Sequence, residues 1–490
     1  MPESPAAMST DLPLREPSLF REQCFLAGAW TGTPVTPVYS PHNQAVLGRV
    51  PNMGIRECSE AIRAAQIAFT EWSRYSALER SGLIARFAQL CRDSQEDLAH
   101  ILTLEQGKPL AEARAEIAYG TSFLQWFAEE ARRVYGDVIP SADRDSRIVV
   151  LRQPVGVVAA ITPWNFPNAM ITRKAGAALA AGCSILIKPA PETPFSALAL
   201  AVLAEQAGIP PGVFSVITGD AASIGSAMTS DPLVRKLSFT GSTAVGRTLL
   251  RDCAATVKKV SLELGGNAPF VVFDDADVDR AVRDLIGSKF RNSGQTCVCP
   301  NRVFVQENVY EVFALKLADA VRKLRVGSGL DEGVAIGPLI NERAVTKVAA
   351  HIDDAVQRGA VVLTGGKRHA LGGTFFEPTV LTEVPIDTLC CREETFGPLA
   401  PLIRFRTEEG VVQLCNATEA GLAAYVYTSD LSRAWRMAEA LENGMVGVNR
   451  AAISVDAAPF GGVKQSGLGR EGSKYGVEEY TEMKYLCLGL

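Results

Sequence analysis

Three kinds of side chain that could carry out acyl chemistry together occur in the middle of the chain. Cys297 lies in a polar stretch, residues 290–300, and Glu263 ends an apolar run before two glycines that let another backbone approach closely. Asn165 lies in the loop 162–167, which two prolines make rigid. A thiol can form a covalent intermediate, a carboxylate can activate water, and an amide N–H can stabilise an oxyanion. Each residue alone has a commoner role in packing, capping or turn formation.

A second group of motifs is suited to binding phosphate and ribose groups. Gly241 and Ser242 lie between an expected strand and an expected helix, where free backbone N–H groups favour a pyrophosphate. The pattern differs from G-x-G-x-x-G and is weak on its own. Lys188 ends another strand and offers an ammonium group, although a lysine there could also be a surface residue whose stem packs on apolar neighbours. Glu394 lies in a Glu-Glu-Thr-Phe-Gly-Pro loop, where an acid alone indicates little.

Composition argues against several classes of protein. The 490 residues carry 49 basic and 54 acidic side chains, a net charge of −5 without a basic run, which argues against nucleic-acid binding. The four histidines lie far apart, so we expect no metal site. The 11 cysteines are scattered and odd in number, which suits a reducing, cytoplasmic compartment. Residues 175–187 are too few to span a membrane, and residues 1–20 do not resemble a secretory signal.

Apolar periodicity predicts an α/β protein. Residues 61–133 read as helices, and residues 155–273 alternate between short strands and helices, which predicts a mostly parallel sheet with helices on both faces. Ligands bind beyond the carboxyl ends of such strands. The predicted strands are 155–161, 184–188, 213–217, 236–239, 259–262 and 268–272, and the predicted helices are 168–182, 194–208 (with Thr193 as N-cap), 221–229, 242–253 and 278–290.

The remaining segments predict a second α/β unit and an isolated strand pair. Residues 302–448 again alternate, with helices at 310–324, 344–358 and 432–443. Residues 138–151 read as a hairpin and residues 479–490 as a strand. A hairpin with so little core of its own is expected to pack on something else.

Five motifs together resemble the aldehyde dehydrogenase superfamily from about residue 23 to residue 490. They are Pro-Trp-Asn-Phe-Pro, Phe-Thr-Gly-Ser, Leu-Glu-Leu-Gly-Gly, Gly-Gln-Thr-Cys and Glu-Glu-Thr-Phe-Gly-Pro, in the family's order and spacing. The segments 289–292, 296–299 and 459–476 are most similar to the succinate-semialdehyde dehydrogenase branch. The resemblance implies a Rossmann-like cofactor domain (1–135 and 154–266), a second α/β catalytic domain (267–448), a small β oligomerisation arm (136–153 and 473–490) and a return to the cofactor domain and site (449–472).

The resemblance also implies roles for the three candidate catalytic residues. Cys297 would attack the aldehyde as a thiolate to give a thiohemiacetal, whose oxyanion the Asn165 amide and the Cys297 backbone N–H would stabilise. Hydride transfer to a nicotinamide would leave a thioester, and Glu263 would activate the water that releases the acid. None of these steps requires histidine, which agrees with how few histidines there are.

The cofactor implied by the resemblance is NAD or NADP. Relatives that require NAD have a glutamate three residues after the lysine, where this chain has the uncharged Pro191. We therefore expect NADP to be accepted, with any preference for it left open because Glu192 could partly restore the acid. The residues expected to bind the cofactor are Thr162, Trp164, Lys188, Pro191, Gly219, Gly241, Ser242, Leu264, Glu394 and Phe396.

The implied substrate is an ω-carboxy aldehyde. In the similar branch, arginines at the positions of Arg173 and Arg291, with Ser454, hold the substrate carboxylate, and a guanidinium fork suits that role. Taken singly, each arginine could equally be a solvated or ion-paired residue. Arg450 and Ala451 depart from the small Thr-Gly that usually follows the asparagine in that branch. Glutarate semialdehyde, longer by one methylene, is therefore a close alternative to succinate semialdehyde, as is a broad-range aldehyde dehydrogenase.

Further expectations concern regulation, assembly and rival functions. Cys299 is either a small loop residue or, as in similar enzymes, a partner of Cys297 in a reversible disulfide. The arm implies a homodimer or homotetramer, and the branch implies a place in γ-aminobutyrate degradation. A cysteine hydrolase would need a base such as histidine, which the motifs lack. A non-catalytic protein of this fold would lack one of the three candidate residues, and a CoA-acylating relative would lack Glu263.

Overall fold

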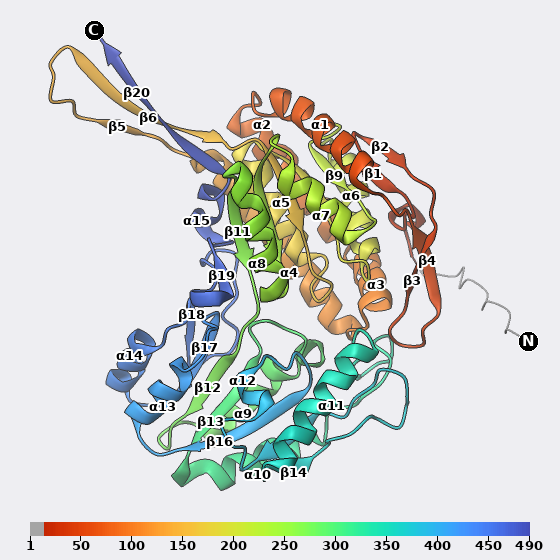
Figure 1. Ribbon diagram of the computed structural model, residues 1–490, viewed down its shortest axis with the longest axis vertical. Helices are drawn as coiled ribbons and strands as arrows, with labels where there is room; N and C mark the ends of the chain where they lie inside the picture. Colours follow the sequence, from red (N-terminus) through yellow and green to blue (C-terminus); the bar gives the residue numbers. More distant parts are fainter. Residues whose placement is uncertain (1–13) are drawn as a thin grey trace, which may run out of the picture.

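Two twisted, mostly parallel sheets organise the molecule in the computed structural model, which describes residues 14–490 (Figure 1). Part of the N-terminal stretch that we judged not to be a secretory signal, residues 1–13, lies outside the described residues. The larger sheet has the order β19-β11-β10-β7-β8-β9-β1-β2. Its strands are β1 (Cys24–Leu26), β2 (Ala29–Thr31), β7 (Val157–Ile161), β8 (Ser184–Lys188), β9 (Phe214–Val216), β10 (Val234–Thr240), β11 (Lys259–Glu263) and β19 (Gly467–Leu468).

Helices cover both faces of this sheet, which explains why β8 is buried along its whole length. One apolar core lies under α1 (Ile55–Trp72), α7 (Ala221–Ser230) and α8 (Thr243–Cys253). The other face carries α2 (Ala77–Asp93), α3 (Gln95–Gln106), α4 (Leu110–Glu130), α5 (Ala169–Ala181) and α6 (Pro194–Ala207). A separate two-stranded sheet of β3 (Thr36–Tyr39) and β4 (Val46–Val50) lies near the N-terminal end of the described chain.

The second sheet has the order β14-β15-β16-β13-β12-β17-β18, in which only β14 runs antiparallel to its neighbour. Its strands are β12 (Ala268–Val272), β13 (Pro300–Gln306), β14 (Val361–Thr364), β15 (Thr379–Thr382), β16 (Leu399–Phe405), β17 (Ala423–Tyr427) and β18 (Met445–Val448). The sequence placed strand 268–272 in the first alternating stretch, whereas β12 is a central strand of this second sheet. The chain crosses between the two sheets at Gly265 and Gly266.

The second sheet is also covered on both faces. One core involves α9 (Val278–Lys289) and α10 (Tyr310–Val321), and the other involves α11 (Glu342–Gln357), α12 (Leu389–Arg392), α13 (Glu408–Asn416) and α14 (Leu431–Ala440). Figure 1 shows this body below the larger sheet, with the β11–β12 connection running between them.

A three-stranded antiparallel sheet projects from the body as an arm at the top of Figure 1. It contains β5 (Asp137–Ile139), β6 (Ser146–Pro154) and β20 (Thr481–Gly489), and β6 pairs with β20 along nine residue positions. The helix before β20, α15 (Ser473–Glu478), packs against α4 and α5 on the body instead.

The beginning of α6 is capped by a distant carboxylate. We expected Thr193 to cap α6, but its side chain makes no capping hydrogen bond. The buried Glu105 instead accepts hydrogen bonds from the N–H groups of Phe195 and Ser196, both at 2.8 Å. A carboxylate at this end also interacts favourably with the helix dipole. Desolvation raises the pKa of Glu105 to about 8.

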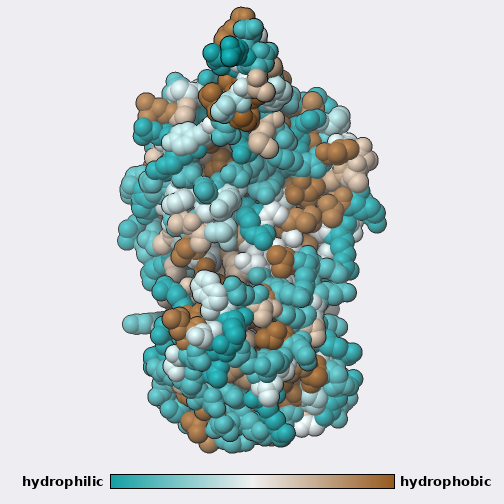
Figure 2. Space-filling model, turned by 90° about the vertical axis from the view of Figure 1, so that its left-hand side faces the viewer, coloured by the Kyte–Doolittle hydropathy of each residue, from teal (hydrophilic) through white to brown (hydrophobic). Residues whose placement is uncertain are grey.

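The surface in the view of Figure 2 is mostly hydrophilic, with small separate hydrophobic patches and the arm at the top. Within residues 14–490, the helices are all too short or too polar to cross a lipid bilayer.

Candidate active site

A cavity of about 720 Å³ opens where loops from the two sheets meet. Strands β10 and β11 end at it with Thr240 and Glu263, and the loop after β7 contributes Trp164 and Asn165. Parallel sheets bind ligands at this edge because their strands end there together and loops diverge beyond it. The cavity thus brings together residues from five of the motifs noted in the sequence.

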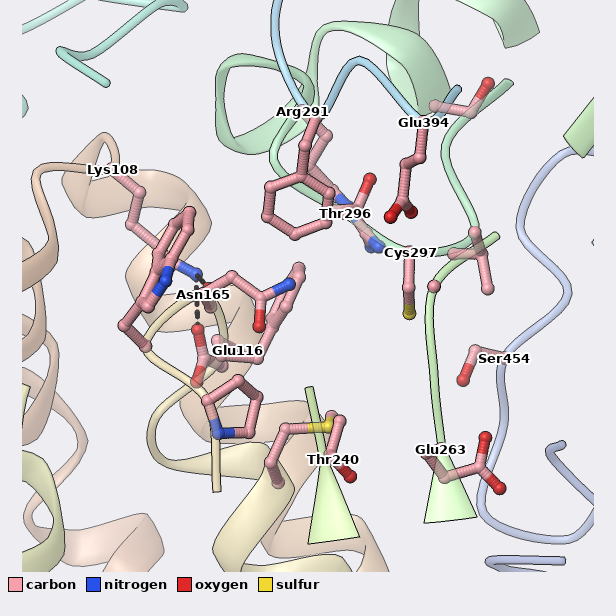
Figure 3. A pocket seen from close by; sticks show the side chains of 18 of the residues that line it. Lys108, Glu116, Asn165, Thr240, Glu263, Arg291, Thr296, Cys297, Glu394 and Ser454 are labelled. Carbon is pink, nitrogen blue, oxygen red and sulfur yellow. Dashed lines mark hydrogen bonds and ion pairs between the residues drawn. The ribbon is translucent and has the colours of Figure 1, made fainter. Parts of the chain in front are cut away.

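Cys297 lies in a loop held by close backbone contacts on two sides. A Cβ atom at Gly266 would lie 2.3 Å from the Cys297 carbonyl oxygen, and one at Gly294 would lie 2.1 Å from the Gly397 oxygen. Asn292 and Ser293 have φ values of 52° and 54° in the turn that precedes the loop. Such left-handed conformations cost energy and persist only where surrounding contacts impose them. In Figure 3 the thiol projects into the cavity between Asn165 and Glu263.

The Cys297 thiol has a raised pKa in the protein without ligands. Desolvation, with the nearby carboxylates of Glu394 and Glu263, raises this pKa to about 12, against a smaller opposing effect of Arg173. Burial and nearby negative charge both disfavour a second anion. The thiolate that attacks the aldehyde stays a prediction.

Glu263 is 4% exposed at the end of β11. Burial raises its pKa well above the usual range, and the charge of Glu471 adds to this rise. Its Oε2 atom has no hydrogen-bond partner among the described residues, which leaves an acceptor available to a water molecule in the cavity. A carboxyl group with a raised pKa is suited to exchanging protons near neutral pH.

Asn165 is fixed through both its side chain and its backbone. Its Nδ2 donates to the Gln295 oxygen at 3.0 Å, and its own carbonyl oxygen accepts from Lys108 Nζ at 2.7 Å and Asn292 Nδ2 at 2.9 Å. An amide nitrogen carries two hydrogens, so one donor remains for an oxyanion. The 6% exposed residue therefore presents its amide in a defined position.

The two arginines expected to bind a carboxylate differ in their surroundings. Arg173 is 2% exposed and forms an ion pair with Glu471 at 2.8 Å. Arg291 is exposed, lines the same cavity, and has no ion-pair partner within 4.0 Å among the described residues. Its guanidinium lies 5.2 Å from the centre of the Phe166 ring. Of these two arginines, Arg291 is therefore the one whose guanidinium is not paired with a carboxylate among the described residues.

Ser454 also lines the cavity and shares a hydrogen bond with the Tyr119 hydroxyl. Tyr119 in turn accepts a hydrogen bond from Arg173 at 3.3 Å. The segment with the unusual sequence lies directly before Ser454: Ala451 and Ala452 line the cavity, and Arg450 bonds the Ala452 carbonyl oxygen at 3.0 Å. The departure from the branch's pattern thus lies at the cavity wall.

The residues expected to bind a dinucleotide lie in and beside the cavity. Those that line it are Trp164, Gly241, Ser242, Leu264, Glu394 and Phe396, together with Glu192. Lys188, Pro191 and Gly219 line a second cavity of about 40 Å³, and Thr162 lines neither. The Thr240 hydroxyl is buried without a partner, and Ser242 caps α8 through Val245 N–H at 3.4 Å. A strand end, a helix N-terminus and an unpartnered hydroxyl fit a pyrophosphate group.

One acidic group and one basic group of this region, Glu394 and Lys188, have shifted pKa values. Desolvation raises the pKa of Glu394 to about 7, although its Oε1 accepts a hydrogen bond from Gly266 N–H at 3.0 Å. Desolvation lowers the pKa of Lys188, whose ammonium donates to the Pro189 oxygen at 2.9 Å. Lys188 is 3% exposed, so it is not the surface lysine that was its alternative interpretation.

Cys299, the possible redox partner of Cys297, is buried. Its sulfur accepts a hydrogen bond from the buried Lys289 ammonium at 3.2 Å and donates toward the Lys289 and Pro300 carbonyls. All eleven cysteines are free thiols, and the disulfide stays a prediction. Within the part of the chain that the structure describes, no cluster of three or more His, Cys, Asp or Glu side chains is placed to hold a metal ion.

Several residues of the site were missed by the sequence analysis. Lys108 and Glu116 form a buried ion pair at 2.5 Å beside Asn165, and Glu471 pairs with Arg173 and Lys174 beneath the cavity. The available signal was the presence of charged residues on helix faces that are otherwise apolar, as at Glu112 and Glu116 in α4. Such a pattern marks unusual positions but does not identify their partners.

Comparison with known proteins places these features in a family. The model of the aldehyde dehydrogenase family matches residues 30–486. A 3-sulfolactaldehyde dehydrogenase of Pseudomonas putida is 60% identical over 98% of this chain and 99% of its own length. A glutarate-semialdehyde dehydrogenase of Pseudomonas aeruginosa is 58% identical (97% and 99%), and so is a succinate-semialdehyde dehydrogenase of Escherichia coli that is named for NADP(+) (97% and 100%).

A solved structure agrees with these matches. The crystal structure of succinate-semialdehyde dehydrogenase from Burkholderia pseudomallei superposes with a TM-score of 0.96 at 59% identity, covering 98% of this chain and 100% of that one. The predicted α/β class and the resemblance stated from the motifs are both confirmed. The chain belongs to the aldehyde dehydrogenase family.

Proposed function

We propose that this aldehyde dehydrogenase oxidises an ω-carboxy aldehyde, with succinate semialdehyde as the first candidate. The observation that carries the proposal is the exposed, unpaired guanidinium of Arg291 on the wall of the cavity that holds the Cys297 thiol. A carboxylate at one end of a short substrate would bind the guanidinium while the aldehyde at the other end meets the sulfur. The Ser454 hydroxyl would donate a further hydrogen bond to that carboxylate.

The chemistry follows from three side chains. Loss of the Cys297 proton lets the sulfur add to the aldehyde carbon, and the Asn165 amide with the Cys297 backbone N–H would stabilise the oxyanion of the thiohemiacetal. A bound nicotinamide supplies the acceptor for the hydride, and a thioester on Cys297 remains. Glu263 then takes a proton from water, whose oxygen displaces the sulfur and gives the carboxylic acid. One aldehyde and one water thus yield one acid, two electrons and two protons, of which the hydride carries both electrons and one proton.

The high pKa of Cys297 makes its ionisation depend on what binds beside it. Three groups around it shape that pKa: the carboxylates of Glu394 and Glu263 raise it and Arg173 lowers it. An oxidised nicotinamide ring is positively charged, and a positive charge beside a thiol favours the thiolate. We propose that cofactor binding, rather than the protein alone, lowers this pKa toward neutrality.

NADP is the cofactor that the adenosine side suits, with NAD as the alternative. Pro191 carries no charge that would repel a 2′-phosphate, and the buried ammonium of Lys188 lines the same small cavity. The relative from Escherichia coli is named for NADP(+). Glu192 is the one acid of this segment, and it lines the larger cavity.

The substrate has a close competitor. A relative of equal identity is named for glutarate semialdehyde, and another for 3-sulfolactaldehyde, so an anionic tail is common to the three names while its length and its anionic group differ. One methylene changes binding in a pocket by about 1–3 kcal/mol. Ala451, where the succinate-semialdehyde branch usually has glycine, changes the cavity wall, which favours testing the longer substrate beside the shorter one.

The domain division and the assembly are proposed on the same basis. Residues 1–135 and 154–266 would bind the cofactor, 267–448 would carry the nucleophile, and 449–472 would return to the site. Residues 136–153 and 473–490 would form the arm of a homodimer or homotetramer, in which an exposed edge strand finds a partner. The cytoplasmic location and the place in γ-aminobutyrate degradation stay predictions.

One experiment tests the proposed function. Formation of reduced nicotinamide is followed with NADP and with NAD across succinate semialdehyde, glutarate semialdehyde, butanal and acetaldehyde. We expect the two ω-carboxy aldehydes to have a kcat/KM at least tenfold above the uncharged ones, and Cys297→Ser to lose more than 1,000-fold of kcat because the nucleophile is gone. Equal rates for acetaldehyde and succinate semialdehyde would contradict the substrate class.

A further inference from the structure

A dehydrated ion pair lies directly behind the amide of Asn165. Lys108 Nζ and Glu116 Oε2 are 2.5 Å apart, and their side chains are 0% and 1% exposed. Lys108 lies in the connection before α4 and Glu116 lies within α4, a part of the chain that does not carry any of the three catalytic candidates. Figure 3 shows the pair on the side of Asn165 away from the Cys297 thiol.

The pair holds the Asn165 segment at both ends. Lys108 Nζ donates to the Asn165 carbonyl oxygen at 2.7 Å. Glu116 Oε1 accepts from the N–H groups of Asn168 at 3.0 Å and Ala169 at 3.2 Å, where α5 begins without a capping side chain of its own. A charged partner makes each of these hydrogen bonds stronger than a neutral one. The segment 165–169 can therefore shift little.

The same carbonyl oxygen joins this pair to the nucleophile loop. Asn292 Nδ2 donates to the Asn165 oxygen at 2.9 Å, and Asn165 Nδ2 donates to the Gln295 oxygen at 3.0 Å. Gln295 Nε2 in turn donates to the Asn292 oxygen at 3.1 Å. Lys108 thus connects the segment before α4 to a hydrogen-bond network that reaches Gln295, two residues before Cys297.

Stability alone does not explain a charged pair here. Burial lowers the pKa of Lys108, because the ammonium loses its water, and a buried ion pair is often no more stabilising than apolar side chains of the same volume. The pair does supply directed, charge-assisted contacts that an apolar pair could not. Those contacts end on the backbone of the residue whose amide must face the oxyanion.

We propose that Lys108 and Glu116 are positioning residues that set the orientation of the Asn165 amide for stabilising the oxyanion. The proposal rests on the proposed function, in which Asn165 is the oxyanion donor. Lys108 and Glu116 act through Asn165, and their contribution to kcat exists only while its amide is present.

A double-mutant cycle tests the proposal in the full-length enzyme. Asn165→Ala is expected to lower kcat about 100-fold, as the loss of an oxyanion donor does. Lys108→Met is expected to lower kcat about tenfold and to leave the KM of the nicotinamide cofactor within twofold. In the Asn165→Ala background, Lys108→Met should change kcat less than twofold, because the coupled effect has already been lost.

Two further variants keep the test usable when Lys108→Met does not fold. Glu116→Gln retains an oxygen acceptor for the start of α5, and Lys108→Met/Glu116→Gln removes both charges so that neither is left buried alone. Each should show the same loss of kcat and the same dependence on Asn165.

Lys236→Met is the matched control. Lys236 is also a buried lysine beside a glutamate, with Nζ 3.5 Å from Glu479 Oε2, but its other contacts are Ser261 and the Tyr480 ring. We expect Lys236→Met to lower thermal stability while kcat stays within twofold of the wild type.

The outcomes separate the two proposals. An Asn165→Ala enzyme with unchanged kcat would overturn the oxyanion role and the proposed function with it. A strong effect of Asn165→Ala combined with an unchanged kcat in Lys108→Met would overturn the positioning role alone. A tenfold loss from Lys108→Met that persists in the Asn165→Ala background would also overturn it, because the effect would then be general to the fold.

Discussion

The two ends of the cavity are built differently. At the inner end, Glu263 and Arg173 are at most 4% exposed, and Asn165 is held by hydrogen bonds from several segments. At the outer end, Arg291 is exposed and has no ion-pair partner among the described residues. Two small side chains, Ala451 and Ala452, also line the cavity. The inner end therefore fixes the chemistry, and the outer end can change its preferred tail with few substitutions.

This contrast agrees with the names of the relatives. Proteins that are 58–60% identical to this chain carry names of three different substrates, all aldehydes. A fixed inner end and a variable outer end of the cavity would explain how proteins of similar sequence can differ in the aldehyde substrate that they are named for. The following predictions test the contrast, beginning with the inner end.

The largest effect expected is on the reactivity of the Cys297 thiol. Because its pKa is about 12, the thiolate fraction of the free protein should rise about tenfold for each pH unit, and alkylation of Cys297 should become about 100-fold faster from pH 7 to pH 9. Iodoacetamide labelling followed by mass spectrometry of the Cys297 peptide measures this rate. Oxidised NADP should shift the profile to lower pH.

Cys487 provides the control for the labelling experiment, since it is exposed on β20 and lies outside the cavity. Its labelling should not respond to NADP. A Cys297 rate that already levels off below pH 8 without cofactor would show that the protein alone holds the thiolate, and would remove this difference between the free and bound states.

Replacing each of the two arginines with alanine should distinguish a substrate-binding role at the outer end of the cavity from a structural role at the inner end. Arg291→Ala is expected to lower kcat/KM for succinate semialdehyde about 10- to 100-fold, because a charge-assisted hydrogen bond contributes about 1.5–3 kcal/mol. The kcat/KM for butanal, which has no carboxylate, should stay the same. The free energy of unfolding in urea should be little changed, since Arg291 has no ion-pair partner among the described residues to lose.

Arg173→Ala is the companion variant. It leaves the buried Glu471 with only Lys174 as a cation, so we expect a loss of roughly 3 kcal/mol in the free energy of unfolding. If Arg291→Ala were instead the destabilised variant and Arg173→Ala changed only the KM of the ω-carboxy aldehydes, the roles assigned to the two residues would be reversed.

The smallest effect concerns the rim. The double substitution Arg450→Thr/Ala451→Gly restores the residues usual in the succinate-semialdehyde branch. We expect it to shift the ratio of kcat/KM between succinate and glutarate semialdehyde by about three- to tenfold toward succinate, within the range that one methylene can discriminate. Thr256→Ser, in the turn after α8 and outside the residues that line the cavity, is a suitable control. An unchanged ratio would show that this segment does not select tail length.

The elements of the fold could be predicted wherever local patterns decide them. Strands β8 and β12 have the predicted bounds, because each is a short apolar run between turn residues. The sheet that β12 joins could not be predicted, because a buried strand reads the same in either sheet. The cap of α6 was missed for a related reason: the acceptor of its first N–H groups is Glu105, 90 residues away, while the side chain of the local candidate Thr193 makes no such bond.

The candidate site shows the same limit. Motifs indicated Cys297, Glu263 and Asn165, and the structure brings all three around one cavity, since each follows the end of a strand or helix. The raised pKa of Cys297 was not predictable, because it depends on burial and on carboxylates from two other segments. The pairing of Arg173 with Glu471 depends likewise on a contact between distant parts of the chain.

The contact between Gly266 and Cys297 has a mechanical consequence. Gly266 lies on the segment that passes from one sheet to the other, and the carbonyl of Cys297 rests where its side chain would otherwise be. A side chain at Gly266 would collide with that carbonyl and displace the loop that carries the sulfur. The placement of the nucleophile therefore depends on a glycine that takes no part in the chemistry itself.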